Sequence, residues 1–199
     1  MNAKQAERLR LKIKRTKAAL AADKRRWGGL CDDSHGLRYM PPQYYIQLGD
    51  YDGGLKYMKW FQKNFPEDSG FPDFLFEWTL ILFMSGKIPE AEKKALQTFY
   101  SNVYLFDKFF GNPIVPLDKY EGSNIETPEY MNHFFYSSKQ TDLSDFSQWL
   151  ANFIKTEQFM IASRKFIDIY TRLKVTHDQE LRSSLIREAL ELEIEMDFD

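Results

Sequence analysis

Two helical segments meet at a glycine turn in the stretch Tyr44-Tyr-Ile-Gln-Leu-Gly-Asp-Tyr-Asp-Gly-Gly-Leu-Lys-Tyr-Met-Lys-Trp-Phe61. The same layout returns in Leu80-Ile-Leu-Phe-Met-Ser-Gly-Lys-Ile-Pro-Glu-Ala-Glu-Lys-Lys-Ala-Leu-Gln97. Each stretch places apolar residues at helical spacing on both sides of a glycine. Because the turns are so short, the two helices of each stretch must run antiparallel. The two stretches therefore predict two helical hairpins.

The two turns resemble the inter-helix turn of the tetratricopeptide repeat. The turn glycines lie 37 residues apart, close to the family period of about 34. In that family the glycine starts the turn, an apolar residue two positions later packs beneath it, and a small residue five positions later lets the helices approach. These places are filled here by Gly49, Tyr51 and Gly54, and then by Gly86, Ile88 and Ala91. The resemblance implies stacked helical hairpins.

The resemblance covers residues 38–103, and the alternative is two ordinary hairpins that share turn chemistry. Pro66 stands where the family has its closing proline, whereas Val103 replaces the second one and Pro41-Pro42 shortens the first helix. Three further stretches are similar to a small bacterial family described as tetratricopeptide-containing, and they imply no activity. These are Ala-Ala-Asp-Lys-Arg-Arg-Trp-Gly-Gly, Phe-Pro-Glu-Asp and Ala-Leu-Gln-Thr-Phe-Tyr-Ser-Asn.

Helical periodicity extends over most of the remaining chain. Residues 3–26 lack Gly and Pro, and their apolar stripe is Ala6, Leu9, Ile13, Thr16 and Leu20, continued by Trp27. A last helix is expected from about residue 178, with Leu181, Leu185, Ala189, Leu192 and Met196 on one stripe. No segment alternates with period two, so the sequence predicts an all-α fold.

The expected organisation is one domain over residues 1–199, of a length that can bury a sizeable core. Its parts are a basic N-terminal helix (1–27), the two repeat-like hairpins (38–103), a long connection (111–140) and C-terminal helices (141–199). The connection contains Gly111, Pro113, Pro116, Gly122 and Pro128, and a short helix is expected near 128–134. Long connections of this kind are sometimes functional.

Composition excludes several classes of protein. A hydrophobic content of 43% argues against a disordered chain, and a single Cys excludes a disulfide framework and favours a reducing compartment. The densest apolar run, 78–84, is far shorter than the roughly 20 residues that a membrane-spanning helix needs. The basic N-terminus lacks the apolar region of a secretory signal. We therefore expect a cytoplasmic protein without a membrane partner.

Charge is distributed unevenly behind a net value of −2. Residues 1–26 hold ten basic and two acidic residues, whereas residues 188–199 hold six acids and no base. Pairing of the two terminal helices, within the chain or in a dimer, is the favoured interpretation, because a charge run is usually a solvated face. The alternative is that the basic face neutralises nucleic-acid phosphates. That face consists of Arg8, Lys12, Arg15, Arg25 and Arg26.

The sequence predicts no catalytic site, no metal site and no cofactor. Cys31 and His35 lie four residues apart, but zinc needs more ligands than these, and Asp32, Asp33, His133 or His177 would have to converge on them by folding. Asp50-x-Asp52-Gly lacks the closing Glu of a calcium loop. No phosphate-cradling glycine motif and no nucleophile elbow occurs.

We expect a non-enzymatic protein-interaction module, with nucleic-acid association as the alternative function. Repeats of the resembled family present the face of each first helix, and an apolar or aromatic peptide is the expected ligand. Alternatively, the apolar side chains of this face pack on a neighbouring helix. Self-association as a homodimer is also expected, because two repeats are fewer than the roughly three that stand alone. The predicted face is Tyr39, Gln43, Ile46, Gln47, Asp73, Phe76, Leu80 and Phe83.

Overall fold

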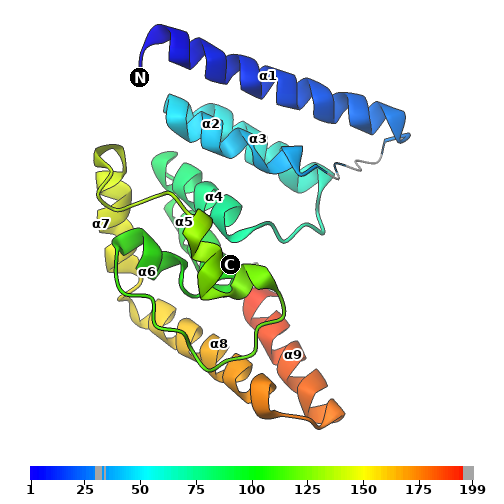
Figure 1. Cartoon of the computed structure of the whole chain (residues 1–199), viewed down its shortest axis with the longest axis vertical. Helices are drawn as coiled ribbons and strands as arrows, with labels where there is room; N and C mark the ends of the chain where they lie inside the picture. The colour runs from blue at the N-terminus through cyan, green and yellow to red at the C-terminus, as the bar shows by residue number, and fades with distance from the viewer. Residues whose placement is uncertain (30–32, 34, 195–199) are drawn as a thin grey trace. The chain divides into compact units, whose positions relative to one another are not determined.

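The computed structural model describes residues 1–29, 33 and 35–194, and this part of the chain contains helices and no strand (Figure 1). The all-α prediction is therefore confirmed. The α-helices are α1 (Ala3–Arg26), α2 (Pro41–Leu48), α3 (Tyr51–Asn64), α4 (Pro72–Met84), α5 (Ile88–Ser101), α6 (Leu105–Phe110), α7 (Ser144–Phe153), α8 (Glu157–Val175) and α9 (Gln179–Ile194). Short 3₁₀ helices are η1 (Leu37–Tyr39), η2 (Asn124–Glu126), η3 (Pro128–His133) and η4 (Thr141–Leu143).

The backbone forms two compact units. The first comprises Met1–Gly70 and Glu77–Ile88, and the second comprises Phe71–Phe76 and the chain from Pro89 onward. Helix α4 thus contributes its first residues to the second unit and its later residues to the first. One domain over the whole chain stays a prediction.

The predicted turns occur where glycine ends a helix. Gly49 follows α2 with a φ of 66°, and Gly86 follows α4 with a φ of 71°; only glycine adopts this left-handed region without strain. Tyr51 and Ile88 begin α3 and α5. The small residues Gly54 and Ala91 are both buried.

The core of the first unit joins α1, α2, α3 and the later residues of α4. Helix α1 packs on η1 and α2, and α2 packs on α3 (Figure 1). Aromatic rings cross these interfaces, with Tyr45 at 6.2 Å from Tyr57 and Phe61 at 5.9 Å from Trp78 between ring centroids. Tilted and edge-to-face contacts of this kind add to the burial of apolar area.

The second unit is organised around Phe76, which is fully buried. Its ring lies 5.0–5.4 Å from four other aromatic rings, measured between centroids. They come from α6, from the end of the long connection and from α7, and are Phe109, Phe134, Tyr136 and Phe146. Helices α8 and α9 form a further packed pair in this unit.

The long connection 111–140 is held to the second unit by hydrogen bonds. The Asn102 side-chain amide donates to the carbonyls of Ile125 and Thr127 at 2.7 and 3.1 Å. The amide of Tyr120 donates to the Tyr170 carbonyl at 2.8 Å. The expected short helix occurs as η3. A buried Asn that satisfies two chain carbonyls fixes the route of an irregular segment.

Gly54 allows α3 to approach α4 closely. A Cβ atom at this position would lie 3.0–3.3 Å from three side-chain atoms of Ile81, which is itself fully buried. We predict that Gly54→Ala lowers the free energy of unfolding by about 1 kcal/mol, because overpacking outweighs the gain in helix propensity. Urea unfolding measures the change.

An Ile81→Val background is the control for this close approach. Valine lacks the Cδ1 atom that makes the nearest contact, at 3.0 Å. Gly54→Ala should therefore lower the free energy of unfolding less in the Ile81→Val background than in the natural chain. Such a difference is a coupling between neighbouring sites. Strictly additive effects would contradict the contact.

Candidate functional site

The structure corrects the predicted peptide-binding face at its apolar centre. Phe76 and Leu80 are both 0% exposed, and Ile46 is 6% exposed. The reason is visible at Phe76, whose ring is enclosed by four aromatic rings from segments that follow it in the chain. These side chains are core residues and cannot contact a partner in the folded protein. They fit the alternative interpretation, in which the apolar side chains of this face pack within the protein.

The other predicted face residues are only partly available. Tyr39 donates a hydrogen bond to Asp68, and Asp73 accepts one from the Tyr130 hydroxyl at 3.1 Å. Gln43 and Phe83 are half-buried, and Gln47 is exposed. Asp73 and Phe76 belong to the second unit, and the remaining six residues belong to the first.

Phe76→Ala tests the role of Phe76 as a core residue. We predict a loss of about 3–5 kcal/mol in the free energy of unfolding, because truncation leaves a cavity among the surrounding rings. Thermal or urea unfolding measures it. Phe135→Ala is the matched control, because Phe135 is 53% exposed and its truncation should cost less than about 1 kcal/mol. Equal losses in the two variants would contradict this assignment.

The basic face of α1 lies in solvent. Arg8, Lys12, Arg15, Arg25 and Arg26 are all exposed. Among the described residues, none of the ten basic side chains of α1 forms an ion pair. Lys12 lies over the Tyr44 ring at 5.2 Å, and Lys24 donates to the Asn64 side chain at 2.6 Å. A charge of this size without internal counter-charges attracts anions.

Helical spacing arranges part of this face into one ridge. Steps of four and three residues connect the ridge from the first turn of α1 to its last, on the side opposite the buried Ile13 and Leu20. Every member is exposed, and the ridge spans about 32 Å at 1.5 Å per residue. We call it the outer ridge; its members are Lys4, Arg8, Leu11, Arg15, Ala18, Ala22 and Arg25.

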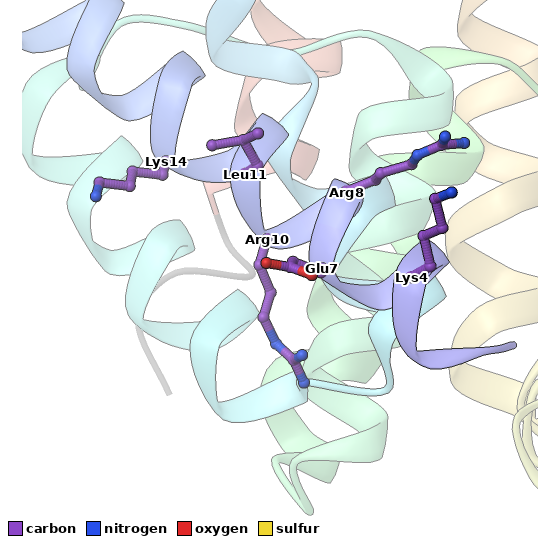
Figure 2. A pocket seen from close by; sticks show the side chains of 6 residues that line it. All are labelled: Lys4, Glu7, Arg8, Arg10, Leu11 and Lys14. Atoms are coloured by element: carbon purple, nitrogen blue, oxygen red, sulfur yellow. The ribbon is translucent and has the colours of Figure 1, made fainter.

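The first half of the outer ridge borders a shallow depression on α1 (Figure 2). Figure 2 shows that all its side chains project from this one helix, with Leu11 between Arg8 and Lys14. Leu11 is 44% exposed. The depression is lined by Lys4, Glu7, Arg8, Arg10, Leu11 and Lys14. It offers cations around a small apolar centre.

The acidic C-terminal helix has its own partner. Leu185, Ala189 and Leu192 are buried, and α9 packs on α8. Glu188 lies 3.9 Å from the Lys165 amine of α8. Ile13 and Leu20 of the α1 stripe, and the three buried residues of the α9 stripe, are thus covered inside their own units, whereas Leu181 is 46% exposed. Met196 and the acids of residues 195–199 lie outside the described residues.

A buried ion-pair network anchors the chain that follows α1. The Asp33 carboxylate, whose side chain is 1% exposed, accepts from the Leu37 and Arg38 amides at 2.9 and 2.8 Å and lies 3.2 Å from Arg38 Nη1. Arg38 Nε donates to Asp68 at 2.6 Å. The Asp33 amide donates to Asp23 of α1 at 3.3 Å. The network therefore links α1, η1 and the α3–α4 connection.

Two tyrosines complete this network. The Tyr39 hydroxyl lies 2.7 Å from both Asp68 carboxylate oxygens, and the Tyr57 hydroxyl donates to the Arg38 carbonyl at 2.7 Å. Burial, followed by the hydrogen bond to Asp68, raises the pKa of Tyr39 from 10.0 to about 12. Burial likewise raises the pKa of Tyr57. Both groups thus favour the neutral phenol, and the arrangement fits an anchor rather than a proton donor working near neutral pH.

The raised pKa of Tyr39 makes stability depend on alkaline pH. Above pH 10 an unfolded tyrosine ionises whereas folded Tyr39 stays neutral, so its contribution is complete below pH 10 and is lost as pH rises to about 12. We predict that the free energy of unfolding falls across this window, and that Tyr39→Phe makes the fall shallower. Urea unfolding at several pH values measures both slopes. Identical slopes would contradict this assignment.

Lys119 is a buried amine that the sequence patterns did not single out. Its side chain is 3% exposed and its amine lies 3.7 Å from Glu121 and over the Tyr104 ring at 5.7 Å. Burial lowers the pKa of Lys119, and the charge of Glu121 opposes that effect. Because this amine is enclosed, we interpret Lys119 as a further anchor of the long connection.

Among the described residues we find no arrangement suited to metal-dependent or nucleophilic catalysis. No group of three or more His, Cys, Asp or Glu side chains there could hold a metal ion. His35 is exposed, whereas Cys31 and Asp32 lie outside the described residues. In the same part of the chain, no helix is both long and apolar enough to cross a membrane.

Comparisons with known proteins add no relative. No protein-family model, no curated protein and no solved structure matches the chain. The resemblance to the tetratricopeptide repeat stays a prediction.

Proposed function

We propose that the protein is a non-enzymatic binding module that docks a polyanionic partner on the outer face of α1. The observation that carries the proposal is the exposed basic face, whose cations have no ion-pair partner among the described residues. Supplying anions from a partner would neutralise charges that repel one another along one helix. We also propose a cytoplasmic location, which the single Cys favours.

The rigidity of α1 supports a docking role. Its N-terminus has a capping box, in which Asn2 and Gln5 each accept from the backbone amide of the other at 2.9 Å. Its inner stripe packs on η1 and α2, and Asp23 connects its last turns to the buried network. A helix fixed at both ends presents its cations without a large cost in backbone entropy on binding.

The apolar peptide ligand expected from the resembled family has less support. The side chains that were to form its anchors include Phe76 and Leu80, both buried. Self-association stays a proposal, with two repeat-like hairpins as its reason.

Neutralising the outer ridge should remove binding. We predict that Arg8→Gln/Arg15→Gln/Arg25→Gln elutes from heparin at markedly lower salt, because fewer counterions are displaced on binding. Glutamine keeps helix propensity, so the fold should persist. Salt-gradient elution, with circular dichroism to check folding, measures the effect.

The matched control removes three exposed cations from the second unit. Lys155→Gln/Arg164→Gln/Arg187→Gln changes the net charge equally. Its elution should stay closer to that of the natural protein. No salt-dependent retention of the natural protein, or an equal loss in both triple variants, would contradict docking on α1.

A further inference from the structure

From the last turn of α1 and the outer ridge we infer that the polyanion is a single-stranded nucleic acid, with Trp27 as a stacking residue. This inference rests on the proposed function. It selects one partner class among polyanions, which include acidic proteins, double-stranded nucleic acids and sulfated sugars.

The last turn of α1 brings cations and an aromatic ring together. Lys24, Arg25 and Arg26 occupy that turn, and Trp27 caps the helix. Trp27 is 50% exposed, and the Arg26 guanidinium carbon lies 5.7 Å from its ring centroid. The sequence pattern assigns Trp27 to the buried stripe, and its exposure corrects that prediction. A half-exposed indole among cations offers an aromatic face on which a planar ring can stack.

The two residues after Trp27 are glycines with open surroundings. Gly28 and Gly29 follow it with positive φ values of 62° and 105°. A Cβ atom added at either glycine would meet no atom within 4 Å. Neither glycine adds a side chain beside the indole, half of which is exposed.

The chemistry of this end distinguishes between classes of polyanion. Asp and Glu side chains would pair with the arginines but would offer nothing to the indole. The bases of a duplex already stack on one another, so they are not available to Trp27. An unpaired base stacks on an aromatic ring while its phosphates pair with neighbouring cations. A single-stranded nucleic acid satisfies both features.

The outer ridge suits a phosphate backbone, which would pass round the last turn of α1 to reach Trp27. The ridge cations Arg8 and Arg15 stand on either side of Leu11, and the small side chains Ala18 and Ala22 lie between Arg15 and Arg25. Small residues let a strand approach the helix, and the flanking arginines contact phosphates regardless of sequence. We therefore expect weak dependence on base sequence.

Fluorescence anisotropy with labelled oligothymidylate tests this inference on the full chain. Competitors are a duplex of equal length and polyglutamate, at one fixed salt concentration. We predict that oligothymidylate binds more tightly than both. Trp27→Ala should weaken binding roughly fivefold to a hundredfold, the range for loss of one stacked base, while Trp27→Phe should retain most of the affinity. Phe135→Ala, which removes an exposed ring from the second unit, should change nothing.

The outcomes separate this inference from the proposed function. If heparin, polyglutamate and oligothymidylate all fail to bind, the proposed function itself is overturned. If polyglutamate or the duplex binds as tightly as oligothymidylate, the function stands and the single-strand assignment is overturned. If Trp27→Ala binds oligothymidylate like the natural protein, stacking on Trp27 is overturned. Melting temperatures of both Trp27 variants equal to that of the natural protein would exclude a folding defect.

Discussion

Helix α1 has only a narrow stripe of residues that can be buried. The exposure of the rest of the helix follows from this constraint. Only Ile13 and Leu20 are fully covered on this helix, while cations occupy most of its remaining circumference. Burying those cations without partners would cost several kcal/mol each. The first unit can therefore cover only one side of α1, on η1 and α2. The opposite side must remain in water or meet a partner that brings negative charge.

The cores of both units are built largely from aromatic rings. In the first unit, rings from α2, α3 and α4 meet beneath α1, and the Asp33–Arg38–Asp68 network ties the following chain to the α3–α4 connection. In the second unit, the rings around Phe76 join segments far apart in sequence. Binding is thus left to surfaces, and α1 carries ten basic side chains that form no ion pair among the described residues.

Sequence patterns predicted the helices well because glycine and proline mark their ends. Gly49 and Gly86 end helices as expected, and periodicity placed Ile13 and Leu20 inside. The exposure of Arg8 and Arg15 was predictable because charge resists burial. The burial of Phe76 was not predictable, since its neighbours Phe134 and Phe146 follow tens of residues later. The Asp33–Arg38–Asp68 network was missed for the same reason. Trp27 is exposed, although the sequence pattern assigned it to the buried stripe of α1.

An NMR titration of the ¹⁵N-labelled full chain with an unlabelled single-stranded oligonucleotide tests most directly whether the ligand docks on α1. Arginine Nε–H and backbone signals report which surface the ligand contacts. We predict that shifts concentrate on the outer ridge of α1 and at Trp27, and that signals of α8 and α9 stay unchanged. Shifts confined to the second unit, with α1 unaffected at saturating ligand, would contradict this prediction.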